Sequence, residues 1–360
     1  MDAVMSVAMN QPQAAVFVGP GQPFLFQSFD RPTLSEGEAL VQIDCCTLCG
    51  SDLHTIGGKR PASVPLILGH EIIGRLVETT DGLCAIDGAP LHQGDRVSWA
   101  IAASCDDCFF CRAGLPQKCV RLFKYGHQGI ASGTPLSGGL ATHCHLVSGT
   151  HLVKVPETIP DRVACPANCA TATVAAALRV AGNCAGKTVA VFGAGMLGLT
   201  AAALLRSLGA SHVVVVDINP RRAERATEFG ATSTDFREIH PLTENRGCDL
   251  ALDMSGSNAA IQQALSSLRI GGRLILVGSV FPTEDLKVQP EDLVRRMIRI
   301  EGVHNYTPAD LQFAIDFLKT EQNQFPFESL VAREYPLQDL QRAIRDAVDD
   351  RPIRVAIRPS

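Results

Sequence analysis

The chain has 360 residues, more than a single hydrophobic core usually organises, so we expect two domains. Its 46% hydrophobic and 19% charged residues exclude a disordered, collagen-like or coiled-coil protein, and its net charge of −5 offers no cationic surface for nucleic acid or an anionic membrane. The 13 cysteines are too dilute for a secreted disulfide scaffold, which leaves buried thiols or metal ligands.

The N-terminal stretch MDAVMSVAMNQPQ contains Asp2 but no Lys or Arg, so it lacks the cationic residues of secretory and mitochondrial targeting peptides. The longest apolar run, from Val189 to Leu205, is interrupted by glycines and is shorter than the ~20 residues that a membrane helix needs. This run is typical of a strand followed by a helix. We therefore expect a cytoplasmic protein without a membrane partner.

Short alternating segments separated by Gly and Pro extend from the start to about Val155 and predict β-strands. They include EALVQIDCC, GRLVETT, GDRVSWAIA and THLVKVP. Within this region CGSDLH spans Cys49 to His54, and GHE follows with His70 and Glu71. Taken alone, His70 is more often an ordinary buried histidine and Cys49 a buried thiol.

Four cysteines lie in the polar loop SCDDCFFCRAGLPQKC, and they are Cys105, Cys108, Cys111 and Cys119. Closely spaced thiols of this kind predict a closed tetrahedral zinc site that stabilises a lobe with little apolar core. An iron–sulfur cluster is the main alternative, because three of the thiols are spaced C-x2-C-x2-C. The position of the fourth cysteine and the absence of a following Cys-Pro favour zinc.

From about Asp161 the pattern changes to alternating helices and strands. The Ala-rich stretch from Ala164 to Val180 predicts a helix, and TVAVFGAG, HVVVVD, CDLALDMSG and GGRLILVGSV predict strands. Near-continuous apolar strands that alternate with helices indicate a parallel sheet buried on both faces. Towards the C-terminus, PADLQFAIDFLKTE and LQDLQRAIRDAVDD predict two helices and RVAIRP predicts a closing strand.

A glycine pattern, Gly193, Gly195 and Gly198, stands at the turn from the strand TVAVF into a helix. Here the glycines allow a tight turn, close approach of a pyrophosphate, and close packing of helix on strand. The next strand ends at Asp217, whose carboxylate is suited to the adenosine ribose hydroxyls and repels a 2′-phosphate. This favours NAD over NADP, although Arg221 and Arg222 could bind that phosphate.

In this order, CGSDLH, GHE, GDRV, the four-cysteine loop, GAGMLG and IRVAI resemble the medium-chain, zinc-dependent alcohol dehydrogenase family along essentially the whole chain. The resemblance implies an α/β protein with a GroES-like β-barrel catalytic domain over residues 1–160 and 305–360. It places the zinc lobe at about 104–120 and a doubly wound, parallel Rossmann domain over 161–304. The sequence is also similar to a bacterial subgroup linked with phosphonate catabolism.

The resemblance further implies a catalytic zinc held by Cys49, His70 and a third ligand about 24 residues before the first glycine of the fingerprint. Counting back from 193 gives 169, which is Cys169, whereas Cys165 lies too early and is interpreted as structural. Two zinc ions per chain, one catalytic and one structural, and NAD are therefore the expected cofactors.

The resemblance also assigns roles to the residues around this zinc. It implies that Ser51 hydrogen-bonds the alcohol oxygen, that His54 passes the proton to solvent, and that Asp52 orients His70. Glu71 would lie beside the metal as an outer contact or transient ligand, with a purely structural role left open. The implied cofactor-binding residues are Thr173, Gly193, Gly195, Met196, Leu197, Gly198, Asp217, Arg222, Gly278 and Arg354. Arg354 takes a pyrophosphate role because Gly50 stands where some members of the family carry a cation.

We expect a primary or secondary alcohol, cyclic alcohols included, or the matching carbonyl compound as the small-molecule substrate. A polyol or amino-alcohol dehydrogenase is the nearest alternative, although Cys169 disfavours the Glu-ligated polyol type. A zinc-stabilised binding protein without catalysis is a second alternative, and the intact site residues argue against it. The partner is expected to be a second copy of the chain, in a homodimer or homotetramer.

Overall fold

The computed structural model describes residues 11–359 of the chain. Residues 1–10, which carry most of the stretch used above for the expectation about targeting, lie outside the described part. The chain divides into two compact units: Met1–Cys169, Thr307–Lys319 and Phe327–Ser360 form the first, and Ala170–Tyr306 with Thr320–Pro326 form the second. The architecture is the expected combination of a β unit and an α/β unit with a parallel sheet.

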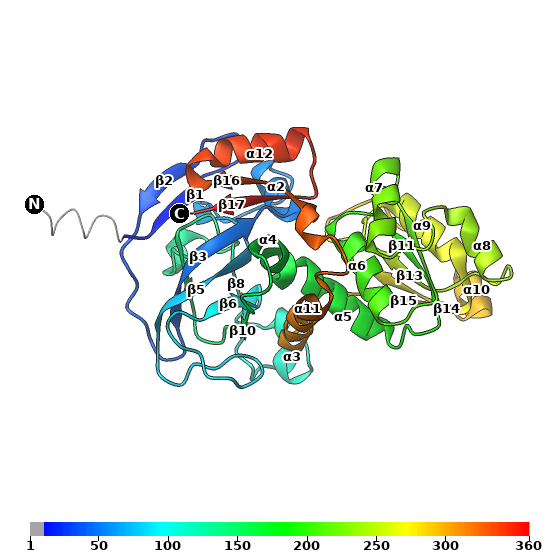
Figure 1. The fold of residues 1–360 in the computed structure, drawn as a ribbon, viewed down its shortest axis with the longest axis horizontal. Helices are drawn as coiled ribbons and strands as arrows, with labels where there is room; N and C mark the ends of the chain where they lie inside the picture. The colour runs from blue at the N-terminus through cyan, green and yellow to red at the C-terminus, as the bar shows by residue number, and fades with distance from the viewer. Residues whose placement is uncertain (1–10, 360) are drawn as a thin grey trace, which may run out of the picture. The chain divides into compact units, whose positions relative to one another are not determined.

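The first unit is built mainly from short strands (Figure 1). Its strands are β1 (Gln13–Phe17), β2 (Leu25–Ser28), β3 (Ala39–Thr47), β4 (Leu66–Ile67), β5 (Glu71–Thr79), β6 (Arg96–Trp99), β7 (Ala102–Ala103), β8 (Phe123–Lys124), β9 (His143–Leu146), β10 (Leu152–Lys154), β16 (Val331–Pro336) and β17 (Arg354–Arg358). Its helices are α2 (Gly50–Ile56), α3 (Phe109–Arg112), α4 (Asp161–Ala164), α11 (Pro308–Glu321, of which the last two residues belong to the second unit) and α12 (Leu340–Asp349).

The central sheet of this unit has the order β10-β6-β5-β3-β17-β16, and β9 also pairs with β3. Figure 1 shows β17, from the end of the chain, beside the blue N-terminal strands. It pairs antiparallel with β3, where Ile357 lies opposite Cys46, and parallel with β16. The predicted closing strand therefore completes the N-terminal sheet.

Helix α12 packs against β16 and β17 because its apolar residues repeat at helical spacing. Leu340, Ala343, Ile344 and Ala347 are buried, one turn after another. They join a core that contains Trp99 and other strand residues. The C-terminal segment thus belongs to the first unit by packing as well as by strand pairing.

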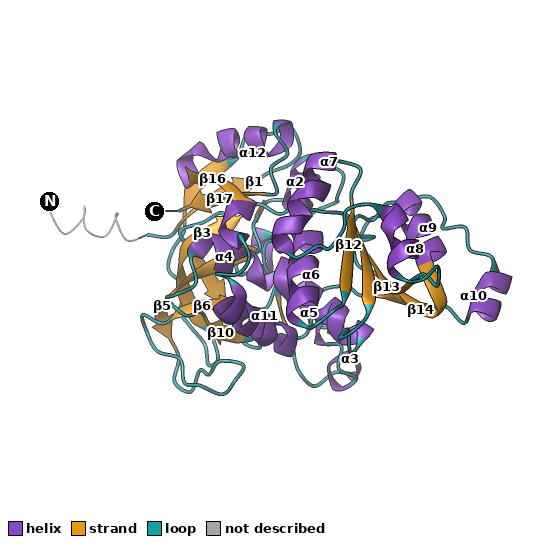
Figure 2. Cartoon of the chain, turned by 45° about the vertical axis from the view of Figure 1, so that its right-hand side comes forward, coloured by secondary structure: helices purple, strands orange, loops and turns teal. Residues whose placement is uncertain are grey.

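The second unit contains one parallel sheet with the order β12-β11-β13-β14-β15. Its strands are β11 (Thr188–Phe192), β12 (His212–Val216), β13 (Cys248–Asp253), β14 (Leu268–Leu276) and β15 (Arg299–Gly302). Its helices are α5 (Ala170–Ala181), α6 (Met196–Ser207), α7 (Pro220–Arg225), α8 (Ile239–Leu242), α9 (Asn258–Ser267) and α10 (Pro290–Arg296). Figure 2 shows α5 and α6 on one side of this sheet and α8 and α9 on the other.

The order of strands reverses beside β11, because β12 lies on one side of it and β13 on the other. This is the switch point at which doubly wound sheets bind nucleotides. The apolar run from Val189 to Leu205 is divided between β11 and α6, as predicted. In the described part of the chain no single helix is long and apolar enough to cross a membrane, and one pair bent by 53°, Asp161–Asn168 with Ala170–Ala181, meets that test by length and composition only.

The single helix predicted from Ala164 to Val180 is wrong in one respect. The chain forms α4, then a 3₁₀ turn over Cys165–Asn168, and only then α5. Between the last two, Cys169 has φ −131° and ψ −71°, which no helix allows. The turn over 165–168 contacts β5, so the first unit ends at residue 169 and not at 160, and it resumes at 307 and not at 305.

Candidate active site and metal centres

Three predicted ligands and one neighbouring carboxylate come together in the first unit. Cys49 precedes helix α2, His70 precedes β5, and Cys169 occupies the break before α5. One ligand atom from each of these residues and from Glu71 lies within 4.8 Å of the others. The Sγ atom of Cys169 is 3.5 Å from Nε2 of His70, close to the spacing that two ligands of one tetrahedral zinc require. These residues therefore fit a zinc ion.

Asp52 links two of these ligands from a fully buried position. Its Oδ2 accepts a hydrogen bond from the Cys49 N–H at 2.9 Å, and its Oδ1 lies 3.2 Å from Nδ1 of His70 and accepts from the Gly69 N–H at 3.3 Å. The second ring nitrogen of His70, Nε2, is thereby turned towards Cys169. This is the carboxylate–histidine arrangement that fixes the orientation of a metal ligand.

The same contacts set the protonation of the ligands. Burial disfavours a charged His70, but the Asp52 carboxylate outweighs it and raises the pKa of His70 to about 10. The hydrogen bond with Cys169, aided by the nearby Arg354, lowers the pKa of the Cys49 thiol well below its usual value despite burial. The thiolate is the form of cysteine that binds metal.

Ser51 and His54 lie on α2, where the local sequence places them one turn apart. The Ser51 hydroxyl is 3.4 Å from Nε2 of His70, so it lies beside the ligand atoms as predicted. Both side chains are partly exposed. The role of Ser51 as hydrogen-bond partner of the alcohol oxygen and that of His54 as proton carrier stay predictions.

Glu71 and Arg354 form a buried ion pair across 283 residues of sequence. Nε and Nη2 of Arg354 donate to the two carboxylate oxygens at 2.8 Å each, and the Thr47 hydroxyl donates to Oε2 at 2.5 Å. Nη2 of Arg354 also lies 3.5 Å from the sulfur of Cys49. Arg354 therefore positions Glu71 beside the ligands, and its predicted contact with a pyrophosphate stays a prediction.

Asn168 is a positioning residue that sequence reasoning missed. Its side chain is fully buried and donates to the carbonyl oxygens of His70 and Trp99, both at 3.0 Å, while it accepts from the Ile72 N–H. It thus ties the turn before Cys169 to the strand that follows His70. An isolated Asn carries no motif, and only its place directly before the third ligand could have drawn attention to it.

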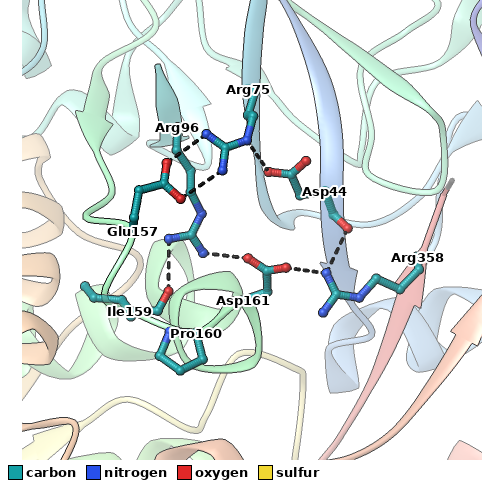
Figure 3. A pocket seen from close by; sticks show the side chains of 8 residues that line it. All are labelled: Asp44, Arg75, Arg96, Glu157, Ile159, Pro160, Asp161 and Arg358. Carbon is teal, nitrogen blue, oxygen red and sulfur yellow. Dashed lines mark hydrogen bonds and ion pairs between the residues drawn. The ribbon is translucent and has the colours of Figure 1, made fainter. Parts of the chain in front are cut away.

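A network of ion pairs anchors the start of the segment that leads to Cys169 (Figure 3). Asp161, the first residue of α4, accepts hydrogen bonds from Arg358 and, at 2.6 Å, from Arg96. Although burial opposes ionisation, these two arginines hold the pKa of Asp161 below its usual value. Arg75 joins the network through two bonds to Glu157 at 2.8 and 2.9 Å. The arginines of β6 and β17 thus hold the helix start, and that of β5 holds the segment before it, around a cavity of about 460 Å³.

The four-cysteine loop forms a second site in the first unit. The sulfur of Cys108 lies 3.5 Å from Cys111 and 4.0 Å from Cys119, and Cys119 lies 3.4 Å from Cys105. A tetrahedron of Zn–S bonds of about 2.3 Å has edges of about 3.8 Å, so these spacings fit zinc. Backbone N–H groups lower the pKa of Cys105 to about 6, which favours the thiolate. This lobe includes α3.

The glycine fingerprint lies in the second unit at the end of β11. Gly193 has φ +108°, which favours glycine, and a Cβ at Gly198 would lie 1.7 Å from the carbonyl oxygen of Gly193. Around Gly195 no described atom outside the residues next to it in the chain lies within 4 Å of the position of a Cβ, so the start of α6 has open space beside it. Oδ2 of Asp217 accepts from the Ala194 N–H at 2.7 Å, which brings this carboxylate to the fingerprint turn.

The other predicted cofactor residues are all in the second unit except Arg354. Met196 and Leu197 begin α6, Thr173 lies on α5, and Arg222 lies on α7. Gly278 follows β14, and its N–H donates to the carbonyl oxygen of Asp253 at 2.9 Å. Contacts of these residues with a cofactor stay predictions.

Comparisons with known proteins match one family model to each unit, except that the second match includes residues 307–319 of the first unit. Residues 35–157 match the family described as "Alcohol dehydrogenase GroES-like domain", and residues 197–320 match "Zinc-binding dehydrogenase". An alcohol dehydrogenase of Geobacillus stearothermophilus is 32% identical over 299 residues, which cover 80% of this chain and 83% of that protein. An L-threonine 3-dehydrogenase of Coxiella burnetii is 28% identical over 323 residues, covering 87% of this chain and 89% of that protein.

The fold comparison extends over nearly the whole chain. The crystal structure of an alcohol dehydrogenase from Thermotoga maritima matches with a TM-score of 0.92 and 28% identity, covering 97% of this chain and 100% of that one. Both compact units are therefore found in a relative of nearly the same length.

Proposed function

The chain belongs to the zinc-dependent alcohol dehydrogenase family of medium-chain dehydrogenases, and on that premise we propose that it catalyses the reversible, NAD-linked oxidation of a primary or secondary alcohol, cyclic alcohols included, to an aldehyde or ketone. The observation that carries the proposal is the convergence of Cys49, His70 and Cys169 with Ser51 beside them. A protein that used this fold only for binding would have no physical need for three converging ligands together with a hydroxyl.

Two zinc ions per chain are proposed, one at these three residues and one at the four cysteines. A zinc ion held by three protein ligands keeps a position for the substrate oxygen, which it polarises as a Lewis acid while lowering the pKa of an alcohol. The four thiols of the lobe leave no such position, so their zinc would have a structural role.

The chain's own residues would then orient the substrate and move one proton. The Ser51 hydroxyl would accept the proton of the alcohol, and His54, one helical turn further along α2, would pass it to solvent. Asp52 would keep the ring of His70 in one orientation throughout. The ion pair of Glu71 and Arg354 places one negative and one positive charge, which cancel, beside Cys49.

NAD is the proposed acceptor of the hydride. Asp217 supports this choice over NADP, because a carboxylate at the end of the second strand would repel a 2′-phosphate. Arg222 lies five residues after Asp217 in the sequence and could reduce the discrimination.

An amino-alcohol dehydrogenase is a second candidate, favoured by the relatives described as L-threonine 3-dehydrogenases. A homodimer or homotetramer is proposed as well. Strand β15 supports it, since within the described residues β15 pairs only with β14 and thus ends the sheet with a free edge. A light-scattering mass near 38.4 kDa would contradict this association.

The test is NADH formation at 340 nm by the zinc-loaded protein with a panel of primary, secondary, cyclic and amino alcohols, each with NAD and with NADP. Ser51→Ala should lower the rate of hydride transfer roughly 10²- to 10⁴-fold while NAD binding is retained. No turnover of any alcohol in the panel would refute the dehydrogenase, and full turnover by Ser51→Ala would refute the proton path.

A further inference from the structure

A loop that follows the four-cysteine lobe lies directly against the ligand His70. A Cβ at Gly126 would lie 2.6 Å from the carbonyl oxygen of Gly69 and 3.2 Å from Cβ of His70, so the backbone at this point is in close contact with the ligand loop. The ring of His127 contacts the ring of His70 in a tilted arrangement, with the centroids 5.3 Å apart and an angle of 30° between the planes. This loop therefore forms part of the wall around the predicted metal site.

Lys124 begins this loop, at the end of strand β8. Its register is fixed, because it lies opposite Ala102 in the pairing of β7 with β8. The side chain is partly buried and close enough to interact electrostatically with both predicted thiolate ligands, Cys49 and Cys169. Burial, together with the charge of Arg60, lowers the pKa of Lys124 to about 8.

Arg60 brings a second positive charge to the same place. It follows helix α2, and its N–H donates to the carbonyl oxygen of His54 at 3.2 Å. Its charge lowers the pKa of both Lys124 and His127, so all three side chains lie within electrostatic range of one another. Like Lys124, Arg60 is partly buried.

Among the residues that the structure describes, neither Lys124 nor Arg60 has a side-chain hydrogen bond or ion pair. Other buried or partly buried cations of this unit behave differently: Arg96, Arg354 and Arg358, for example, each pair with a carboxylate. Zinc would not balance the two charges either, since one Zn²⁺ with two thiolates is neutral overall. Two unpaired, half-buried cations repel each other, and a bound anion would remove that cost.

We propose that Lys124 and Arg60 bind an oxyanion group of the substrate, a carboxylate or a phosphoryl group, so that the enzyme acts on alcohols or carbonyl compounds that carry negative charge. This inference rests on the proposed dehydrogenase function and narrows its substrate class. The substrates expected above, primary, secondary and cyclic alcohols, are accordingly narrowed to those that carry a negatively charged group. Hydrogen bonds from charged donors are stronger than neutral ones and discriminate against a substrate that lacks the matching acceptor.

The test compares short hydroxyalkanoates and hydroxyalkylphosphonates with neutral amides and diols of the same chain length, as substrates of the zinc-loaded enzyme. At least one anionic series should have a kcat/KM roughly 10- to 100-fold above that of its neutral counterpart. The series that gains more identifies the oxyanion. Lys124→Met should remove most of this preference and leave the neutral compounds nearly unchanged.

Three further variants make the result specific. Arg60→Gln should act in the same direction as Lys124→Met, and Lys124→Arg should restore part of the preference because it keeps the charge. Lys59→Met removes an exposed cation next to Arg60 in the sequence and should have no effect. Unfolding temperatures of all variants confirm that they fold.

Calorimetric binding of the anionic compound in the presence of NADH provides a readout independent of turnover, and it should be weakened in Lys124→Met. The proposal is overturned if wild-type enzyme does not prefer the anionic series, if Lys124→Met lowers both series equally, or if its effect lies in the KM for NAD. Good turnover of neutral alcohols without a preference for the anionic series would refute the anion site and leave the dehydrogenase proposal standing. If no compound is turned over, the dehydrogenase proposal fails, and binding that Lys124→Met does not change overturns the anion site as well.

Discussion

Replacing Asp52 by Asn should weaken zinc binding at the predicted catalytic site and leave the four-cysteine site unchanged. The carboxylate of Asp52 receives three N–H groups, from Cys49, Gly69 and His70. An amide has one oxygen to accept and one NH₂ that must then face an N–H donor. Whichever way the amide turns, at least one of these three contacts becomes repulsive.

The size of the effect follows from burial. Asp52 is fully buried, so no water can replace the lost acceptor. Loss of an acceptor that orients a metal-binding histidine typically costs 10- to 100-fold in metal affinity, which corresponds to about 1.4–2.8 kcal/mol. The variant should fall within this range.

The measurement is a zinc competition titration against a chromophoric chelator, in which the four-cysteine site of the same chain serves as an internal reference. Asp107→Asn provides the matched control, since Asp107 is exposed and pairs with Arg112 on the lobe. Unchanged affinity of the first site in Asp52→Asn would refute the positioning role of Asp52. Equal losses at both sites would show general destabilisation and refute it as well.

Cys111→Ser should lower the zinc content from about two ions to about one per chain, seen by elemental analysis, and lower the unfolding temperature, because a structural zinc stabilises its lobe; an unchanged content would contradict a zinc site there. Asp161→Asn should lower the free energy of unfolding by roughly 2–3 kcal/mol at pH 7, measured by urea denaturation. Because the pKa of Asp161 is lowered in the folded state, this stabilisation is present above about pH 4 and is lost as the pH falls through the folded-state pKa. The unfolding free energies of the wild-type protein and Asp161→Asn should therefore converge in acid. A difference between them that does not change with pH would contradict the reasoning. Gly198→Ala should destabilise the second unit by roughly 1–3 kcal/mol and weaken NADH binding in a fluorescence titration, since its Cβ would meet the Gly193 carbonyl; native affinity would show that the turn can adjust.

The parts of the site that could be predicted are those whose residues lie close together in the sequence. Cys49, Ser51 and Asp52 lie at the start of one helix, and the four cysteines lie in one loop. Their spacing in the sequence therefore already indicates that their side chains lie close together. Cys169 was found by counting back from Gly193, and the structure brings it to His70. The strand and helix patterns of the second unit were equally readable, because buried parallel strands are apolar throughout.

The parts that could not be predicted depend on contacts between distant segments. The helix break at Cys169 is stabilised by Asn168 through the backbone of His70, 98 residues earlier. Nothing in the local sequence separates that break from an ordinary Ala-rich helix. Likewise, Lys124 follows a polar lobe, and nothing in the sequence indicates that its charge lies within electrostatic range of Cys49. The roles of such residues can be recognised only when the sheet register is known.

The last strand of the chain, β17, has a consequence for how the protein is made. It lies between β3 and β16, and it carries Arg354 to Glu71 beside the first metal ligands. A ribosome must therefore translate as far as residue 358 before the N-terminal sheet can close. The second unit lies mostly in one stretch, from 170 to 306, so all its strands are synthesised earlier than β17. The half of the molecule that is synthesised first is thus the half that finishes folding last.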